Sequence, residues 1–351
     1  MTMAPGVKTG RAVGPLVTIA IPTYNRAALL RGCVQAALAQ SYENIEILVS
    51  DNASEDETPQ VLQEFSDSRL RIIRQSENIG LLPNWNACLA AARGTYVVFL
   101  SDDDRIAPWF VQRCYSVIAG RPDIPIVVTL CNFRMADIGE MRPPRKSRLL
   151  STGLHDGGNI LTEYLKDDIT VVMCSIMLRT DALRAGGGFP LDFPHTADVA
   201  AWAPVLCGSE AGFVNEACAT YNFHSDSETG RMSVEQILVD GWKMVARISR
   251  AADQNIASRK KRAALKLQAR RGFARRGFAY LAHYRRTGAS LTEVAAFIWR
   301  FRRQMMVVEA VSFVRFLAIV LCPRPLAEAM RTLRRTRTRD AENRPAVARA
   351  G

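Results

Sequence analysis

Short apolar runs alternate with amphipathic segments over the first hundred residues of the chain. Runs rich in β-branched residues predict buried strands, and apolar positions three and four residues apart predict helices. The pattern predicts strands at residues 16–21, 45–50, 70–74 and 95–100, and helices at 26–40, 58–65 and 82–92. Asn25 is a candidate N-cap for the first helix. Strands and helices that alternate in this way favour a mainly parallel α/β sheet with right-handed crossovers.

The pattern is less regular after residue 125 and changes character after residue 232. We expect strands at 126–130 and 171–178, a loop at 186–190, a helix at 198–207 and an extended segment at 213–223. Beyond them the sequence predicts long helices rich in arginine and alanine at 234–252, 256–286 and 291–322. The predicted organisation is a flexible leader at 1–15, an α/β domain at 16–232 and a helical, arginine-rich region at 233–351.

Charge is divided along the chain in a similar way. The 351 residues have a formal net charge of +12, from 46 Lys and Arg against 34 Asp and Glu. Residues 1–246 have a net charge of −7, whereas residues 247–351 have a net charge of +19. The composition, 48% apolar and 23% charged, excludes collagen-like, disordered and polytopic membrane proteins. The positive charge therefore belongs to the C-terminal helices, and the chemistry of the α/β domain is a separate matter.

The cysteines and the N-terminus indicate the compartment. The eight cysteines lie mostly within apolar runs, and no pair has C-x-x-C spacing. This usage is typical of buried, reduced thiols and disfavours a zinc site or a disulfide framework. Because residues 1–15 contain no continuous apolar run, we expect no signal peptide and a cytoplasmic location.

Polar or acidic residues follow each strand predicted in the first hundred residues. In open parallel sheets, ligands bind beyond the carboxyl ends of the strands, so these tips should converge on one edge. The four tips are residues 22–25, 51–54, 77–80 and 101–104. The chain has neither a Walker loop nor a G-x-G-x-x-G motif after its first strand. We therefore expect phosphates to be bound mainly through a metal ion and not through a glycine-rich loop.

Three consecutive carboxylates, Asp102, Asp103 and Asp104, follow the fourth strand directly. Such crowding is electrostatically unfavourable unless a cation is present, and carboxylate oxygens suit Mg²⁺ or Mn²⁺. The alternative is a solvated acidic turn, or an N-cap for a helix over 107–119. Asp51 would accept hydrogen bonds from a base or ribose, or serve as a turn residue; Tyr24 would stack on a base, or be a core aromatic.

Four of these segments resemble family-2 glycosyltransferases of the GT-A fold in their order and spacing. The segments are VTIAIPTYNR at 17–26, ILVSDNASED at 47–56, NIG at 78–80 and GTYVVFLSDDD at 94–104. The resemblance implies a Rossmann-like, mixed and mainly parallel sheet, with a nucleotide-binding half at 16–125 and an acceptor half at 126–232. It further implies an inverting enzyme that uses a nucleotide-sugar donor together with Mn²⁺ or Mg²⁺.

The resemblance also assigns roles to the strand tips. The implied nucleotide-sugar site consists of Pro22, Thr23, Tyr24, Asn25, Asp51, Asn78, Gly80 and Asp102. Thr23, Tyr24 and Asp51 would contact the base, and Asp102 would contact the ribose or the diphosphate. Asp103 would be the metal ligand of the D-x-D element. Because Ser101 stands where many members have aspartate, Asp104 remains an alternative ligand.

The acceptor half carries a weaker version of the same resemblance. Asp198 matches the catalytic base of an x-E-D element in which Ala197 replaces the acidic residue. As a base, Asp198 would take the proton of the acceptor hydroxyl. The alternative is that Asp198 is the N-cap of the following helix. His224 resembles a metal-coordinating histidine and would otherwise be a structural residue. The residues expected on the acceptor side are Gly187, Gly188, His195 and Trp202.

The most apolar stretch of the chain lies at residues 306–322, and its uninterrupted part, 316–322, is too short to span a bilayer. An apolar helix flanked by arginines can lie on an anionic membrane surface, here the inner face of the cell membrane. The alternative is a helix packed on the α/β domain with a solvated basic tail. We expect no nucleic-acid partner, because no nucleic-acid motif is present.

The sequence therefore predicts a metal-dependent inverting glycosyltransferase acting on a saccharide or lipid-linked acceptor, in cell-surface polysaccharide or glycolipid synthesis. A sugar nucleotidyltransferase would share the fold, but it would be expected to carry a glycine-rich basic loop where this chain has residues 22–25. A non-catalytic, donor-binding scaffold at the membrane surface is the third hypothesis. The sequence specifies neither the sugar, the nucleotide, the acceptor and its linkage, nor the oligomeric state.

Overall fold

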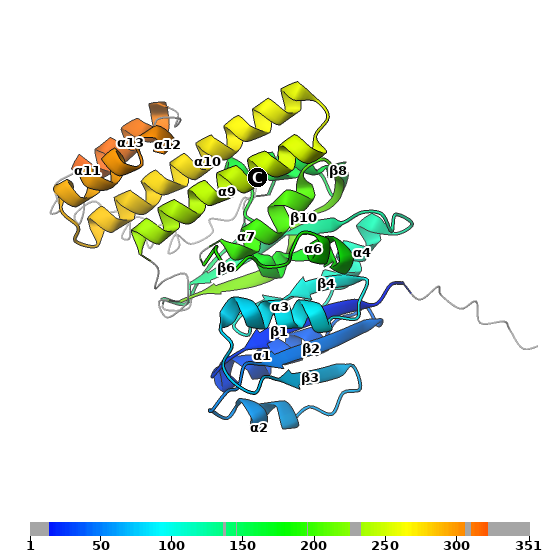
Figure 1. Ribbon diagram of the computed structural model, residues 1–351. Coiled ribbons are helices and arrows are strands. Elements are labelled where there is room, and N and C mark those ends of the chain that lie inside the picture. The colour runs from blue at the N-terminus through cyan, green and yellow to red at the C-terminus, as the bar shows by residue number, and fades with distance from the viewer. Residues whose placement is uncertain are drawn as a thin grey trace, which may run out of the picture. The chain divides into compact units, whose positions relative to one another are not determined.

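The computed structural model describes residues 14–135, 138–144, 146–194, 196–224, 233–305 and 310–321. The chain forms two compact units that divide between Ala269 and Arg270. The first unit is built around one ten-stranded sheet with helices on its faces (Figure 1). The second unit is helical.

The N-terminal part of the sheet is parallel throughout, in the order β3-β2-β1-β4. Its strands are β1 (Val17–Thr23), β2 (Ile45–Asp51), β3 (Leu70–Arg74) and β4 (Tyr96–Phe99). The connecting helices are α1 (Ala27–Leu38), α2 (Thr58–Gln63) and α3 (Leu81–Ala91). Every residue of β1 and β2 is buried, which explains their nearly continuous apolar sequences. The strands and helices predicted here are confirmed, although Arg26, and not Asn25, occupies the N-cap position of α1.

The sheet continues in mixed fashion beyond β4, in the order β4-β9-β6-β10-β5. The additional strands are β5 (Arg105–Ile106), β6 (Ile126–Met135), β7 (Glu140–Arg142), β8 (Gly153–Asp156), β9 (Ile176–Arg179) and β10 (Glu210–Phe223). β9 is antiparallel to both neighbours, whereas β6 and β10 are parallel. β7 pairs with β6, and β8 pairs with β10. The mixed, mainly parallel sheet is therefore as predicted.

The helices that follow β4 are short. They are α4 (Phe110–Ile118), α5 (Gly157–Leu165), α6 (Thr180–Ala185) and α7 (Ala197–Trp202), with 3₁₀ turns η2 (Met173–Ser175) and η3 (Ala203–Leu206). The predicted helix at 198–207 changes to a 3₁₀ turn at its second half, where Pro204 lacks the N–H that an α-helix would use. The strand predicted at 171–178 is wrong in its first half, which contains η2.

The first unit continues beyond residue 232, where the sequence predicted the α/β domain to end. It includes α9 (Val234–Asn255) and the beginning of α10 (Arg259–Arg286). α9 begins at a capping box formed by Ser233 and Gln236 and buries Met244 and Ile248. Its Arg247 donates a hydrogen bond of 2.6 Å to the carbonyl of Ala200. The apolar face of α9 thus belongs to the core of the α/β unit.

The second unit contains the remainder of α10 together with α11 (Leu291–Arg300), α12 (Arg302–Met305) and α13 (Ala310–Leu321). The single helix predicted at 291–322 is wrong, because α11 ends at Arg300 with Phe301 as its C-cap. Among the described residues, no helix is both long enough and apolar enough to cross a membrane.

The cysteines of the described chain are all free, and their side chains are buried. They are Cys33, Cys88, Cys114, Cys131, Cys174, Cys207 and Cys218. Their burial agrees with the apolar runs in which they occur, since free cysteine packs as a small hydrophobic residue. Cys322 lies outside the described residues.

Candidate active site

The tips of β1 and β2 are fastened to each other by short hydrogen bonds. Asn25 has a left-handed backbone (φ 52°); its N–H donates to Ser54 Oγ at 2.9 Å, and its Oδ1 accepts from the Glu55 N–H at 2.8 Å. The preceding Tyr24 is 40% exposed, so it is not a core aromatic. Pro22 and Thr23 complete the buried end of β1. The tip therefore combines a fixed backbone with an aromatic ring that faces solvent.

Asp51, at the end of β2, is buried with both carboxylate oxygens engaged. Its Oδ1 accepts from the Ser54 N–H at 2.9 Å, and its Oδ2 accepts from Arg74 Nη1 at 2.7 Å. The first of these bonds is the turn interaction weighed for Asp51 from the sequence. A carboxylate oxygen has lone pairs for more than one donor, so these two bonds do not exhaust the acceptor capacity of Asp51.

Asn78 and Gly80 are joined to the β2 tip through Asn52, which the sequence reasoning missed. The Asn52 side chain donates to Asn78 Oδ1 at 2.8 Å and accepts from the Ile79 N–H at 3.0 Å. Gly80 has φ 90° and is the N-cap of α3. The glycine thus supplies a backbone conformation that other residues rarely adopt. Asn52 could have been suspected because it directly follows Asp51 at a strand tip.

The side chains of the three consecutive aspartates lie in three different environments. Asp102 Oδ2 accepts from Thr23 Oγ1 at 2.8 Å. Asp103 Oδ2 lies 3.0 Å from His224 Nε2 and 3.0 Å from Arg26 Nη1. Asp104 is 1% exposed, and its Oδ1 accepts from the Asn222 N–H at 2.9 Å. None of the three caps the following helix, because α4 begins at Phe110 with Trp109 as its N-cap.

We call Thr23, Arg26, Asp102, Asp103 and His224 the strand-tip cluster. Burial, followed by the nearby charge of Asp103, raises the pKa of Asp102 to about 7, although Arg26 and Thr23 oppose this effect. Burial and Asp103 also raise the pKa of Asp104. Negative charge at this edge is therefore in excess, and a cation would stabilise it.

Asp103 and His224 have the right chemistry to hold Mn²⁺ or Mg²⁺. They come from segments 121 residues apart, yet a carboxylate oxygen and a ring nitrogen lie 3.0 Å from each other. Two neighbouring ligands of an octahedral ion bound at about 2.1 Å are separated by about 3 Å. In the described ranges, no group of three or more His, Cys, Asp or Glu side chains could hold an ion alone. Further ligands would have to be water or substrate phosphates, as is usual for Mg²⁺.

Asp198 is the second residue of α7, a helix whose N-cap is Thr196. The N-cap role, weighed from the sequence as the alternative for Asp198, is therefore wrong. Burial raises the pKa of Asp198 to about 6, while the backbone N–H groups of Val199 and Asp198 itself act in the opposite direction. Within the described residues, no hydrogen bond or ion pair joins Asp198 to the strand-tip cluster. The carboxylate remains mostly ionised at neutral pH and is more basic than an ordinary aspartate.

The glycine loop before α7 is attached to α3. Gly187 and Gly188 both have positive φ, of 85° and 67°. The Asn86 side chain holds Phe189, the residue after Gly188, by two hydrogen bonds. It donates to the Phe189 carbonyl at 2.8 Å and accepts from the Phe189 N–H at 2.9 Å. Phe189 also packs edge-on against Phe99 of β4, with ring centroids 4.7 Å apart. Asn86, which the sequence did not single out, therefore connects the loop to the nucleotide-binding half.

Comparison with known proteins decides the family. Residues 18–184 match the profile described as Glycosyl transferase family 2, which spans all four strand tips and most of the acceptor-half sheet. The chain belongs to this family. A relative described as an uncharacterized glycosyltransferase of Rickettsia prowazekii is 32% identical over 225 residues, which are 61% of this chain and 66% of that protein. An uncharacterized protein of Mycobacterium tuberculosis is 26% identical over 228 residues, 62% and 70% of the two chains.

The fold of this family-2 glycosyltransferase is similar to that of TarS of Staphylococcus aureus. The TarS structure, solved in complex with UDP-GlcNAc, has a TM-score of 0.62, covering 87% of this chain and 81% of that chain at 16% identity. At this identity the similarity concerns the fold. The GT-A-like architecture predicted from the four strand-tip motifs is thereby confirmed.

Trp202 and His195 are two of the residues expected on the acceptor side of this glycosyltransferase. Trp202 is fully buried, and its ring packs edge-on against Tyr164 with centroids 4.9 Å apart. Its assignment to the acceptor surface is therefore wrong, because a ring enclosed in the core of α5 and α7 cannot touch a substrate. His195 lies outside the described residues.

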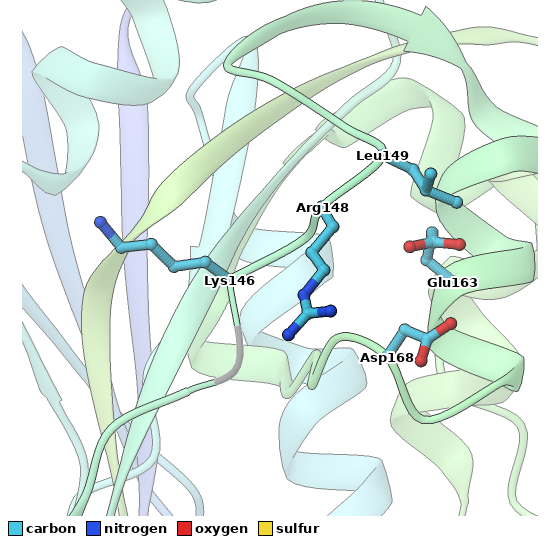
Figure 2. A pocket seen from close by; sticks show the side chains of 5 residues that line it. All are labelled: Lys146, Arg148, Leu149, Glu163 and Asp168. Carbon is cyan, nitrogen blue, oxygen red and sulfur yellow. The ribbon is translucent and has the colours of Figure 1, made fainter.

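The acceptor half of the glycosyltransferase also contains a cavity of about 590 Å³, which sequence reasoning did not predict. Its lining comprises Lys146, Arg148, Leu149, Glu163 and Asp168. Figure 2 shows the Arg148 guanidinium extending into the space opposite Glu163 and Asp168, while Lys146 points away from them. The intervening Ser147 anchors the segment, because its hydroxyl donates to Glu163 Oε2 at 3.3 Å. The cavity is lined by side chains of both signs of charge together with Leu149.

Proposed function

We propose that this chain transfers a sugar from a nucleotide-sugar donor to a saccharide or lipid-linked acceptor, with inversion at the anomeric carbon. The observation that carries the proposal is the strand-tip cluster, in which Thr23, Asp102, Asp103 and His224 meet at one edge of the sheet. The activity fits cell-surface polysaccharide or glycolipid synthesis. The donor class is supported by family membership and by a fold similar to that of a protein solved with UDP-GlcNAc.

The nucleotide is expected to lie over the tips of β1 and β2. There the exposed ring of Tyr24 is available for stacking, and Thr23 and Asp51 are available as polar contacts. Pro22, Asn25, Asn78 and Gly80 hold the backbone of this surface in place. Asp102, fixed by Thr23, faces the ribose or the diphosphate.

Asp103 and His224 are the proposed holders of Mn²⁺ or Mg²⁺, with Asp104 as a buried support for the turn. When bound, such an ion stabilises the negative charge of the departing nucleoside diphosphate. Asp104 accepts a hydrogen bond from the Asn222 backbone two residues before His224, so it fixes the spacing between the two ligands.

Asp198 is the proposed general base. Its carboxylate accepts the proton of the acceptor hydroxyl as that oxygen attacks the anomeric carbon, and one displacement inverts the configuration there. A pKa of about 6 suits this task, because the group is ionised at neutral pH but binds a proton more readily than an exposed aspartate. Gly187 and Gly188 lie on the acceptor side of this carboxylate in the proposed arrangement.

The function is tested by a thermal-shift screen of nucleotide sugars with and without Mn²⁺, followed by transfer assays with the stabilising donor. A ligand that binds only the folded state raises the melting temperature. We expect one class of nucleotide sugar to stabilise the protein, and to do so more strongly with Mn²⁺. Normal transfer by both the Asp103→Ala and the Asp198→Ala proteins would contradict the mechanism.

We further propose that the second unit binds an anionic membrane surface. Trp299 of α11 is 70% exposed, and the Arg302 guanidinium lies 4.3 Å from the centroid of its ring. Val314 and Leu321 of α13 are also exposed. Exposed apolar side chains beside arginines are typical of interfacial helices. Sedimentation with vesicles containing phosphatidylserine tests this, and we expect binding at low salt that is lost at high salt.

A further inference from the structure

Arg26 places one guanidinium nitrogen at the centre of the strand-tip cluster. Its Nη1 lies 3.0 Å from Asp103 Oδ2, 3.5 Å from His224 Nε2 and 3.8 Å from Asp102 Oδ1. All four side chains are largely shielded from solvent, with exposed fractions between 9% and 27%. A positive charge that belongs to the protein therefore stands among the groups proposed to hold a divalent cation.

The backbone around Arg26 is held on both sides. The Asn25 N–H donates to Ser54 Oγ at 2.9 Å, and the Ala27 N–H donates to Asp56 Oδ2 at 3.0 Å. Arg26 occupies the N-cap position of α1, but its side chain makes no capping hydrogen bond. The side chain is thus free of any role in the helix and is directed at the cluster.

Arg26 contacts the same two atoms that would bind a metal ion. Asp103 Oδ2 serves either as an acceptor for a guanidinium N–H or as a ligand for a cation, and a cation would also need the lone pair of His224 Nε2. A ring nitrogen that donates to Asp103 or accepts from Arg26 has no lone pair left for a metal ion. Two cations this close to one carboxylate also repel each other. The guanidinium and the metal ion are therefore competitors.

Two further nitrogens of the Arg26 guanidinium are available to donate hydrogen bonds to a ligand. Within the described ranges, no hydrogen bond uses Nε or Nη2 of Arg26. Guanidinium donors form a planar fork that matches two oxygens of a phosphate group. In the proposed function, the diphosphate of the donor arrives at this same edge of the sheet.

We propose that Arg26 is the internal cation of the metal-free site and a ligand of the donor's diphosphate in the loaded site. When a divalent ion binds Asp103 and His224, the guanidinium leaves these two side chains and turns to the phosphate oxygens. The inference rests on the proposed function, since it requires both a metal ion and a nucleoside diphosphate. It predicts opposite effects of one substitution on two binding equilibria.

The test is the Arg26→Gln variant of the full chain, measured in two titrations. The first titrates Mn²⁺ alone and follows free Mn²⁺ by electron paramagnetic resonance. The second titrates UDP and GDP at saturating Mn²⁺ by calorimetry. We expect Mn²⁺ to bind about tenfold more tightly, because the competing guanidinium is gone. We expect the nucleotide to bind about tenfold more weakly, because one charge-assisted contact to its phosphates is lost.

Two further variants serve as controls. Arg31→Gln removes a charge from the exposed face of the same helix, where Arg31 pairs with Glu64, and reports the effect of net charge alone. Arg26→Lys keeps the charge but loses the planar fork. It should bind Mn²⁺ about as the wild type does and bind the nucleotide more weakly. Melting curves without metal verify that each variant is folded.

Unchanged or weaker Mn²⁺ binding by Arg26→Gln would overturn the competition, and unchanged nucleotide binding would overturn the phosphate contact. A wild-type protein that binds Mn²⁺ but neither UDP nor GDP would contradict the phosphate contact together with the proposed donor. In that case the Mn²⁺ titration still tests whether Arg26 and the metal ion compete. A wild-type protein that binds no Mn²⁺ would contradict both proposals.

Discussion

The carboxylates of the first unit and the arginines of the second unit show how differently charge behaves when it is buried or exposed. Asp102 and Asp104 are buried and Asp198 is half-buried, and burial is the leading cause of their raised pKa values. Arg300, Arg302 and Arg303 are exposed. A buried carboxylate whose folded pKa exceeds its unfolded value destabilises the fold as pH rises through that range, whereas an exposed arginine has little effect on stability.

This difference indicates where in the molecule a charged group can take part in catalysis. Electrostatic interactions are strong only where water is excluded, so the buried carboxylates suit catalysis and cation binding. Exposed charges act weakly and collectively, which suits reversible association with a charged surface. Substitutions in the first unit should therefore alter catalysis by large factors, and substitutions in the second unit should alter association by small factors.

The largest effect is expected from Asp198→Asn, which keeps the shape of the side chain but removes its basicity. Transfer should fall by about 10³-fold, within the usual range for a general base, with little change in nucleotide affinity. Steady-state kinetics and nucleotide titration measure both. The matched control is Asp192→Asn, at an exposed carboxylate just before α7. A transfer rate within about threefold of wild type would remove Asp198 from the mechanism.

A slightly smaller loss, of about 10²-fold, is expected from Asp103→Asn. The variant loses the charge that His224 and Arg26 contact, so Mn²⁺ affinity should fall together with the transfer rate. Asp123→Asn is the control, because Asp123 forms an exposed ion pair with Arg121 away from the cluster. Equal Mn²⁺ affinity in the Asp103 variant and the wild type would contradict the proposed ligand role.

The pH dependence of transfer should show the raised pKa of Asp198. The ionised base is active, so kcat/KM should rise with pH, level off above about pH 7 and fall about tenfold per pH unit below pH 6. The measurement is a pH–rate profile at saturating Mn²⁺. An acidic limb near pH 4, the range of an ordinary aspartate, would show that burial does not control this group.

A moderate effect on stability is expected from Gly188→Ala. A Cβ at this left-handed position would lie 2.5 Å from Asn86 Oδ1, so the clamp on Phe189 would have to shift. We expect a loss of about 1–3 kcal/mol in the free energy of unfolding. Gly187→Ala is the control, since its φ is also positive but its Cβ would meet no atom. Equal losses in chemical denaturation would show that backbone strain alone matters.

The smallest effect is expected in the second unit. Trp299→Ala should weaken binding to phosphatidylserine vesicles by about fivefold, because one interfacial aromatic side chain is lost among several apolar contacts. Leu149→Ala is the control, since Leu149 is equally exposed but belongs to the first unit. Vesicle binding that is identical in the two variants would contradict the proposed surface.

Prediction from sequence succeeded where the signal is local. The strands that end at Thr23, Asp51 and Phe99 are mostly apolar runs, and a parallel sheet brings their tips to one edge without further information. The convergence of Thr23 with Asp102 follows directly from that topology.

The remainder depends on packing between distant segments. The contact of Arg26 with His224 spans 198 residues, and the clamp of Asn86 on Phe189 spans 103. No periodicity in the sequence encodes such pairs. Trp202 was misassigned for a related reason, since a large aromatic residue beside a catalytic motif has the same sequence whether it faces the substrate or the core.

The four residues of β9 have a mechanical consequence. Leu178 pairs with Val97 of β4 on one side and with Ile126 of β6 on the other, so hydrogen-bond ladders run without a break from β4 to β6. Bending between the halves would tear these ladders in a buried strand. Closure of the two halves like the lobes of a hinged enzyme would therefore cost these hydrogen bonds. We therefore expect any substrate-induced movement in the loops at the sheet edge, while the sheet keeps the proposed donor and acceptor sides at a fixed separation.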